Sequence, residues 1–141
     1  MISTEAIEVR KFNPESDEAF VYSTWLKNYK HSSYFAKRIR PMVFFKGHRV
    51  LVDHLLKKES AKTLVAHPKN DPDTILGYLT FEPQVVHFVF VKDPFRKMGI
   101  ATVLLRAAQI ELETATFTHW TFPVDEFVRR WPGMTYDPYK L

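Results

Sequence analysis

The sequence predicts a domain of the mixed α/β class, and three observations carry that prediction. First, Val85 to Val91 is an unbroken apolar run rich in β-branched and aromatic residues, typical of a strand buried on both faces. Second, a similar run precedes it, and only Pro83-Gln84 separates the two, so the two strands should form an antiparallel hairpin. Third, segments with helical spacing alternate with the strands, and 141 residues suffice to bury a core without disulfides.

The N-terminal half is expected to contain one strand and two helices. A short strand should span about Ala6 to Phe12, after which Asn13-Pro14 has the form of an N-cap followed by proline at the first helical position. The first helix then runs to about Lys30, with an apolar stripe at helical spacing made by Tyr22, Trp25, Leu26 and Tyr29. Residues 31–43 show no clean period and predict a loop or a broken helix, and a second helix follows over 44–59.

The C-terminal half is expected to contain most of the sheet. Strands are predicted over 63–66, 75–81, 85–91 and 115–122, with a final short strand within 134–139. A third helix should begin near Gly99, where the apolar residues start to recur at helical spacing, and a fourth helix is predicted over 124–131. The predicted element order is therefore β-α-α-β-β-β-α-β-α-β.

The segment between the buried strand and the third helix has chemical potential. The first N–H groups of a helix have no partner within the helix and lie at the positive end of its dipole, so they can hold a phosphate. Gly99 would let a ligand approach the backbone closely, and Arg96 and Lys97 add positive charge. The alternative is an ordinary strand-to-helix turn that contains a glycine.

This segment resembles the acyl-CoA signature of the GNAT superfamily of N-acetyltransferases. The family pattern V-x-x-x-x-(R/Q)-x-x-G-x-(G/A) is filled at every fixed position by Val91, Arg96, Gly99 and Ala101. The close resemblance covers about residues 75–108. It implies one GNAT-like acyltransferase domain over residues 1–141, with a mixed, mostly antiparallel central sheet flanked by helices on both faces. FTHWTFP and MTYDPYKL are also similar to small GNAT-like proteins of bacteriophages.

The resemblance implies acetyl-CoA as the acyl donor and no metal. The main chain of one strand would pair with the pantetheine arm, an N–H near its end would stabilise the oxyanion, and the backbone of the following turn would bind the pyrophosphate. The residues so implied are Val89, Phe90, Val91, Arg96, Lys97, Met98, Gly99, Ile100, Ala101 and Thr102.

Two side chains are candidate catalysts. An amine is almost wholly protonated at neutral pH, and His87, two residues before the expected thioester region, has a suitable ordinary pKa for a general base. The other interpretation is a core histidine with satisfied ring nitrogens. In the family a tyrosine of the fourth helix, after an Asn-containing start, protonates the departing thiolate, but this sequence has Thr121, Val124 and Val128 at those places. Tyr136 or Tyr139 of the last strand could act instead.

Other site chemistries find little support in the sequence. There is no cysteine, so cysteine nucleophiles, disulfides and thiolate metal sites are excluded. The spacing of His31, His48, His54 and His67 is not that of a metal site, so solvated or capping roles are expected for them. His119 and Trp120 are expected to pack against the fourth helix, with the acceptor cleft as the alternative. The N-terminus has no apolar segment of signal-peptide type, so we expect a soluble protein in the cytoplasm, or in the host cytoplasm if phage-encoded.

Three functions therefore compete. The first is an acetyl-CoA-dependent N-acetyltransferase acting on an amine acceptor, either a protein lysine or N-terminus or a small molecule. The second is a catalytically weak GNAT-fold binding or assembly module that contacts a protein partner. The third is nucleic-acid contact, which the net charge of +4 favours only weakly. The basic residues that would make it are Lys37, Arg38, Arg40, Lys46 and Arg49.

Overall fold

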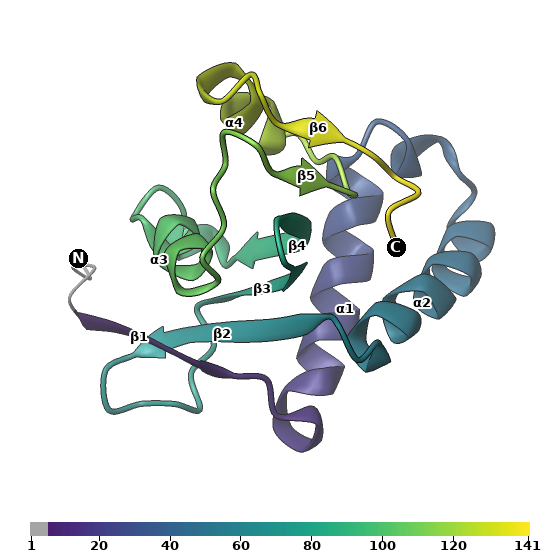
Figure 1. Ribbon diagram of the computed structural model, residues 1–141. Coiled ribbons are helices and arrows are strands. Elements are labelled where there is room, and N and C mark those ends of the chain that lie inside the picture. The colour runs from purple at the N-terminus through teal and green to yellow at the C-terminus, as the bar shows by residue number, and fades with distance from the viewer. Residues whose placement is uncertain (1–5) are drawn as a thin grey trace.

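The computed structural model describes residues 6–141 (Figure 1). In chain order its elements are β1 (Ile7–Lys11), α1 (Pro14–Ser32), α2 (Pro41–Lys57), β2 (Lys62–Pro68), β3 (Gly77–Glu82), β4 (Val85–Val91), α3 (Ile100–Ala107), β5 (Thr116–Phe117), α4 (Val124–Arg130) and β6 (Thr135–Tyr136). Short 3-10 turns lie at Ala36–Arg38 and Asp93–Phe95. The predicted order of strands and helices is confirmed.

The strands form one sheet in the order β1-β2-β3-β4-β5-β6. The first four are antiparallel neighbours, whereas β5 runs parallel to β4 and β6 runs parallel to β5. The sheet is therefore mixed and mostly antiparallel, as expected. The change of direction falls between β4 and β5, where only two residue pairs are in register.

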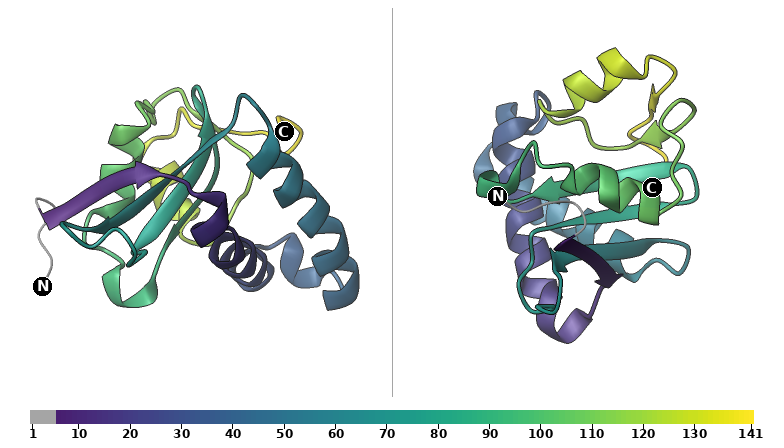
Figure 2. Two further views of the ribbon diagram at one scale, coloured as in Figure 1. Left: turned by 90° about the horizontal axis from the view of Figure 1, so that it is seen from below. Right: turned by 90° about the vertical axis from the view of Figure 1, so that its left-hand side faces the viewer.

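Helices cover both faces of this sheet (Figure 2). One apolar cluster joins α1 and α2 to one face of the sheet. In it Trp25 is fully buried and stacks on Phe88 at a ring-centroid distance of 4.8 Å. The second cluster joins α3 and α4 to the other face, through residues such as Leu104 and Phe127. Because β4 contributes side chains to both clusters, it is buried on both faces over most of its length, as its apolar sequence predicts.

The start of α1 is fixed by its N-cap and by an ion pair. The side chain of Asn13 accepts a hydrogen bond from the Glu15 N–H at 3.1 Å, and Pro14 occupies the first helical position. Asp17 is 1% exposed and accepts hydrogen bonds from the Arg10 guanidinium at 2.7 and 2.9 Å. Burial alone would raise the pKa of Asp17, but the hydrogen bonds from Arg10 and the Asn13 N–H lower it. This contact joins β1 to the first turn of α1.

The predicted bounds of the second helix and of the fifth strand were wrong. The second helix begins at Pro41 rather than residue 44, because proline suits a first helical position and three exposed residues precede Phe44. The strand predicted over 115–122 is only Thr116–Phe117, since the chain then leaves the sheet and the Phe122 N–H bonds to the carbonyl of Ser32 at the end of α1 at 2.7 Å. The last strand, Thr135–Tyr136, lies within the expected range 134–139. Within residues 6–141, no helix is both long and apolar enough to cross a membrane.

Candidate functional site

A β-bulge at His87 reorients the second half of β4. Thr80 pairs with Phe88 and Phe81 pairs with Val86, so His87 is an extra residue with no opposite partner on β3. Before the bulge, the carbonyl of Val86 faces β5, where it accepts from the Thr118 N–H at 3.1 Å. Without the bulge, every second residue after Val86 would continue to point its backbone N–H and C=O groups toward β5. The extra residue reverses this alternation.

The reversal turns the N–H groups of Val89 and Val91 toward β5. The Lys92 N–H donates to the carbonyl of Leu76 at 2.9 Å, on the β3 side, so its neighbour Val91 faces the other way. In the described part of the chain, the pairing of β5 with β4 ends at Val86. After the buried His87 and Phe88, the last three residues of β4, Val89 to Val91, are half-buried, and their unpaired edge could pair with an extended ligand as it would with another strand.

The turn from β4 into α3 is tightly shaped. Lys97 and Gly99 both have positive φ, of 65° and 82°, and Gly99 is the N-cap of α3 with no capping side chain. Gly99 adopts this left-handed conformation without the steric cost of a Cβ. The first turn of α3 contains no acidic residue, so its N–H groups form an uncompensated positive end.

Arg96 is engaged within the turn. Its guanidinium lies 2.7 Å from the carboxylate of Asp93, and its Nε donates to the carbonyl of Val91 at 3.1 Å. These contacts hold the end of β4 against the turn. Lys97 is exposed, and in sequence it is the cation nearest to the start of α3.

Two hollows meet at His119. The first is a narrow gap of about 30 Å³ between β4 and β5, which has room for one or two water molecules. It is lined by Val86, His87, Phe88, Val89, Leu105, Leu112, Phe117, His119, Thr121, Val124, Phe127 and Met134. The second is a cleft of about 600 Å³, a size typical of ligand sites, between the α1–α2 region and the C-terminal tail. It is lined by Tyr29, Phe35, Ile39, Val43, Phe44, Gly47, His48, Leu51, Thr118, His119, Tyr136, Pro138, Tyr139 and Leu141.

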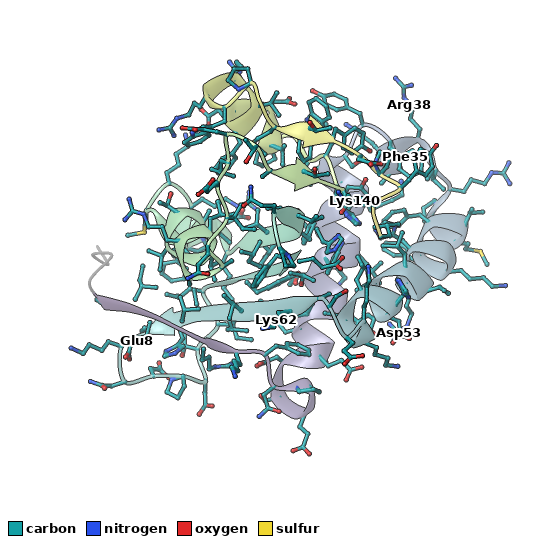
Figure 3. All side chains as sticks on the ribbon, in the orientation of Figure 1. Glu8, Phe35, Arg38, Asp53, Lys62 and Lys140 are labelled. Carbon is teal, nitrogen blue, oxygen red and sulfur yellow. The ribbon has the colours of Figure 1, made fainter. Side chains whose placement is uncertain are left out.

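The cleft lies at one end of the molecule. In Figure 1 the C-terminal tail descends from β6 toward α2, and Figure 3 shows Phe35 and Lys140 at that end of the molecule, with Arg38 pointing outward. None of the described residues that line the cleft carries a carboxylate side chain. The cleft is therefore mainly apolar and aromatic, with histidine, tyrosine and threonine as its polar side chains.

A continuous series of hydrogen bonds leads from this cleft into the protein. Nε2 of His48, on α2, lies 2.9 Å from Nε2 of His119. Nδ1 of His119 lies 2.9 Å from the hydroxyl of Thr118, which in turn lies 2.9 Å from Nδ1 of His87. Nε2 of His87 then lies 2.7 Å from the carboxylate of Glu82, at the end of β3. We call these five residues the histidine chain.

The pKa values of the ionisable groups in the histidine chain are all lowered, but for different reasons in the histidines and in Glu82. Burial lowers the pKa of His48 to about 4 and lowers that of His119 well below its ordinary value. Burial also lowers the pKa of His87, opposed by the Glu82 carboxylate. Partial burial would raise the pKa of Glu82, but hydrogen bonds from Ser60, His87 and Lys58 lower it to about 2. At neutral pH the histidines are therefore neutral and Glu82 is an anion.

The two predicted catalytic side chains lie in different hollows. His87 lines the gap and is 1% exposed, with both ring nitrogens hydrogen-bonded, so it is a satisfied core histidine that also borders the site. Tyr136 lines the cleft, and burial raises its pKa. Tyr139 lines the cleft as well and is 91% exposed.

Sequence reasoning missed His48, whereas for His119 the acceptor cleft was the alternative to packing against the fourth helix, and His119 does line the cleft. The solvated or capping role expected for His48 was wrong, because its ring stacks on Phe44 and Tyr29 and bonds to His119. His119 does not pack mainly against α4 as expected, since its ring contacts Trp25 and Tyr29 of α1. No local pattern marks the pair, because 71 residues separate them in the chain.

Trp120 behaves as predicted. Its indole N–H donates to the carboxylate of Asp125 in α4 at 2.6 Å, and its ring packs edge-on to Phe117 and Tyr136. Neighbouring residues of the segment thus serve different layers: His119 belongs to the α1 side of the sheet and Trp120 to the α4 side.

Comparisons with known proteins find similarity in structure and none in sequence. No protein-family model matches the chain, and no curated protein matches it either. A candidate acetyl transferase from Pyrococcus furiosus is similar with a TM-score of 0.56 and 20% identity, over 72% of each chain. A GCN5-related N-acetyltransferase from Rhodopseudomonas palustris has a TM-score of 0.55 and 13% identity, over 77% of this chain and 66% of that one. A possible acetyltransferase from Clostridium difficile 630 has a TM-score of 0.51 and 18% identity, over 74% and 69%.

These likenesses concern the arrangement of the elements. At such low identity they establish a shared fold and leave the chemistry to the residues of this chain. The fold expected from the residues between Ile75 and Ala108 is confirmed. The bacteriophage resemblance stays a prediction.

Proposed function

We propose that this chain, which has the GNAT fold, is an acetyl-CoA-dependent N-acetyltransferase that transfers an acetyl group directly from the thioester to an amine. The observation that carries the proposal is the half-exposed edge of β4 beside the start of α3. The bulge at His87 turns the N–H groups of Val89 and Val91 to that edge. An extended amide chain and a phosphate group are the two chemistries that this juxtaposition suits.

The acyl donor would be held mainly by main-chain groups. The uncapped N–H groups of Ile100, Ala101 and Thr102 would bind the pyrophosphate, with Lys97 adding charge. Val89, Phe90 and Val91 would pair with the pantetheine arm, and the Val91 N–H would stabilise the oxyanion. The structure adds a competitor to this pairing, because Arg96 already bonds to the carbonyl of Val91. Arg96 would release that carbonyl when the arm binds.

The gap between β4 and β5 would have to widen for the thioester. Its 30 Å³ do not accommodate an acetylated thiol. One wall consists of β4, which is anchored to β3 by the antiparallel ladder. The other wall includes Thr121, Val124 and Phe127 from α4 and the segment before it, where β5 contributes only two paired residues. We expect the α4 side to move and β4 to stay in place.

The acceptor amine would enter through the 600 Å³ cleft, which meets the gap at His119. The aromatic lining and the lack of carboxylate side chains among the described lining residues favour an amine with a neighbouring apolar or aromatic group over a polycation. A protein lysine or N-terminus within an apolar segment and a small hydrophobic amine both meet this description.

The proposal can be tested by binding and turnover with a matched pair of variants. Thr102 is exposed in the first turn of α3, so Thr102→Glu adds a negative charge beside the expected phosphate position, whereas Thr102→Gln adds the same bulk without charge. Isothermal titration calorimetry should show CoA binding to the wild type, weakened at least about tenfold in Thr102→Glu and little changed in Thr102→Gln. Failure of the wild type to bind CoA or acetyl-CoA would refute the proposal. Binding without thioester consumption for any amine would favour the binding-module alternative.

A further inference from the structure

The hydrogen bonds of the histidine chain have a single direction. Glu82 is a carboxylate and can only accept, so Nε2 of His87 must be the donor at 2.7 Å. A neutral His87 then accepts at Nδ1, and the Thr118 hydroxyl gives it its one proton. Thr118 must therefore accept from Nδ1 of His119, which leaves Nε2 of His119 to accept from Nε2 of His48. Every donor in the chain points toward Glu82.

The outer end of this series is His48, a residue that lines the cleft. With its proton on Nε2, His48 has a lone pair on Nδ1, for which no hydrogen bond to a protein atom is found within residues 6–141. Within residues 6–141, the one fully buried polar side-chain atom that lacks a partner is the indole N–H of Trp25. Nδ1 of His48 also lacks a partner, so it is not fully buried. His48 lines the cleft. Its lone pair is thus available to a group bound there.

We propose that the histidine chain is a proton relay, in which His48 takes the proton of the acceptor amine and His87 beside Glu82 receives the charge. This inference rests on the proposed function, since it supplies the base that amine acetylation requires. It also replaces His87 with His48 as the group that touches the acceptor. His87 becomes the inner end of the relay.

The transfer balances at each step. The N–H bond of the ammonium breaks and a bond forms to Nδ1 of His48, whose Nε2 proton passes to Nε2 of His119. The Nδ1 proton of His119 passes to the Thr118 oxygen, and the hydroxyl proton of Thr118 passes to Nδ1 of His87. His48, His119 and Thr118 end neutral with reversed hydrogen bonds. His87 ends as an imidazolium whose Nε2–H is held by Glu82.

The surroundings favour this resting place for the proton. The rings of His48 and His119 are held between Tyr29, Phe44 and Trp25, whose side chains offer no anion. His87 has the carboxylate of Glu82 at 2.7 Å, and Glu82 is itself bonded to Ser60 and Lys58 near the surface. Lys58 and His54 also face His87, and both oppose its protonation more weakly than Glu82 favours it. A proton is therefore more stable at the inner end, and it can leave toward solvent through Glu82.

The direction of the chain can be read without any substrate. Long-range ¹H–¹⁵N correlation of the ring nitrogens in the full-length protein at pH 7 assigns the protonated nitrogen of each histidine. We expect protonated Nε2 in His48, protonated Nδ1 in His119 and protonated Nε2 in His87. Protonated Nδ1 in His48, or protonated Nε2 in His119, would overturn the relay and leave the proposed function standing.

A matched pair at Thr118 tests the passage of protons. Thr118→Val keeps the shape but removes the hydroxyl, whereas Thr118→Ser keeps the hydroxyl. Because general-base catalysis contributes about 10²- to 10⁴-fold, we expect Thr118→Val to lower kcat by at least about tenfold and to move the acid limb of the kcat–pH profile. The KM for acetyl-CoA should change by less than about threefold, and Thr118→Ser should restore both kcat and the profile.

The outcomes separate the relay from the proposed function. Wild-type kcat and an unchanged pH profile in Thr118→Val would overturn the relay while acetyl transfer stands. If the wild type binds CoA but consumes no thioester, both the transferase and the role of the relay fall, whatever the tautomers. If Thr118→Val folds poorly, His48→Phe serves instead. The phenylalanine ring suits the stack between Tyr29 and Phe44 but lacks the nitrogen that takes the proton from the amine, so kcat should fall to the same extent.

Discussion

Replacing Gly77 with alanine should displace the end of β4. A Cβ on Gly77 would lie 2.4 Å from the carbonyl oxygen of Phe90 and 3.2 Å from Cα of Val91, and real Cβ atoms essentially never approach within 3.0 Å. The first contact is with backbone, so β3 and β4 must separate by at least about 0.6 Å or rotate. Overpacking of this kind costs about 1–3 kcal/mol of unfolding free energy.

For a chain of this size each kcal/mol lowers the Tm by about 3–5 °C, so Gly77→Ala should melt about 3–15 °C below the wild type. Gly47 is the matched control, because a Cβ there meets no atom within 4 Å and the residue lies in the middle of α2. Gly47→Ala should raise the free energy of unfolding by about 0.5–1 kcal/mol, as alanine favours a helix over glycine. The two substitutions are chemically identical and should act with opposite signs.

Urea unfolding followed by far-UV circular dichroism gives both free energies. CoA titration of the same samples tests the functional consequence, because Gly77 lies opposite Val91 in the ladder. Gly77→Ala should weaken CoA binding, whereas Gly47→Ala should not. A Gly77→Ala protein with wild-type stability would refute the claim that the close approach of β3 fixes the edge of β4.

Three further predictions concern other parts of the chain. Asp17→Asn should cost about 3 kcal/mol, because it leaves the Arg10 guanidinium without its carboxylate; a loss under 1 kcal/mol in urea unfolding would contradict this. Stability should fall as the pH drops from about 6.5 to about 4, because unfolding lets His48 bind a proton that its lowered folded-state pKa excludes. His48 alone should contribute a slope of about 1.4 kcal/mol per pH unit, and His48→Phe should flatten the curve by that amount. Gly99→Ala should cost about 1 kcal/mol through its φ of 82° and weaken CoA binding, checked by thermal shift with and without CoA.

The sequence predicted the elements whose structure depends on neighbours along the chain. Val85 to Val91 is the strand that its apolar run indicates, and Gly99 precedes α3 as the helical spacing indicates. The bounds of β5 could not be predicted in this way. Its length depends on the hydrogen bond between Phe122 and Ser32, which belongs to a distant helix.

The candidate site was predictable in its main-chain part and hidden in its side-chain part. The signature from Val91 to Ala101 is contiguous, so its turn could be expected from the sequence. His48 and His119 carry no such signal, because α2 and the segment after β5 bring them together only through tertiary packing. His87 was singled out for its place on β4. The bulge that makes His87 the extra residue of that strand became visible only with the register of β3 and β4.

The most direct test of the account is to locate CoA on the protein by amide chemical-shift perturbation in ¹H–¹⁵N spectra. We predict that CoA moves the amide signals of Val89, Val91 and the first turn of α3, while those of β1 and β2 stay in place. Perturbations confined to the cleft around Tyr136, or none at saturating CoA, would contradict it.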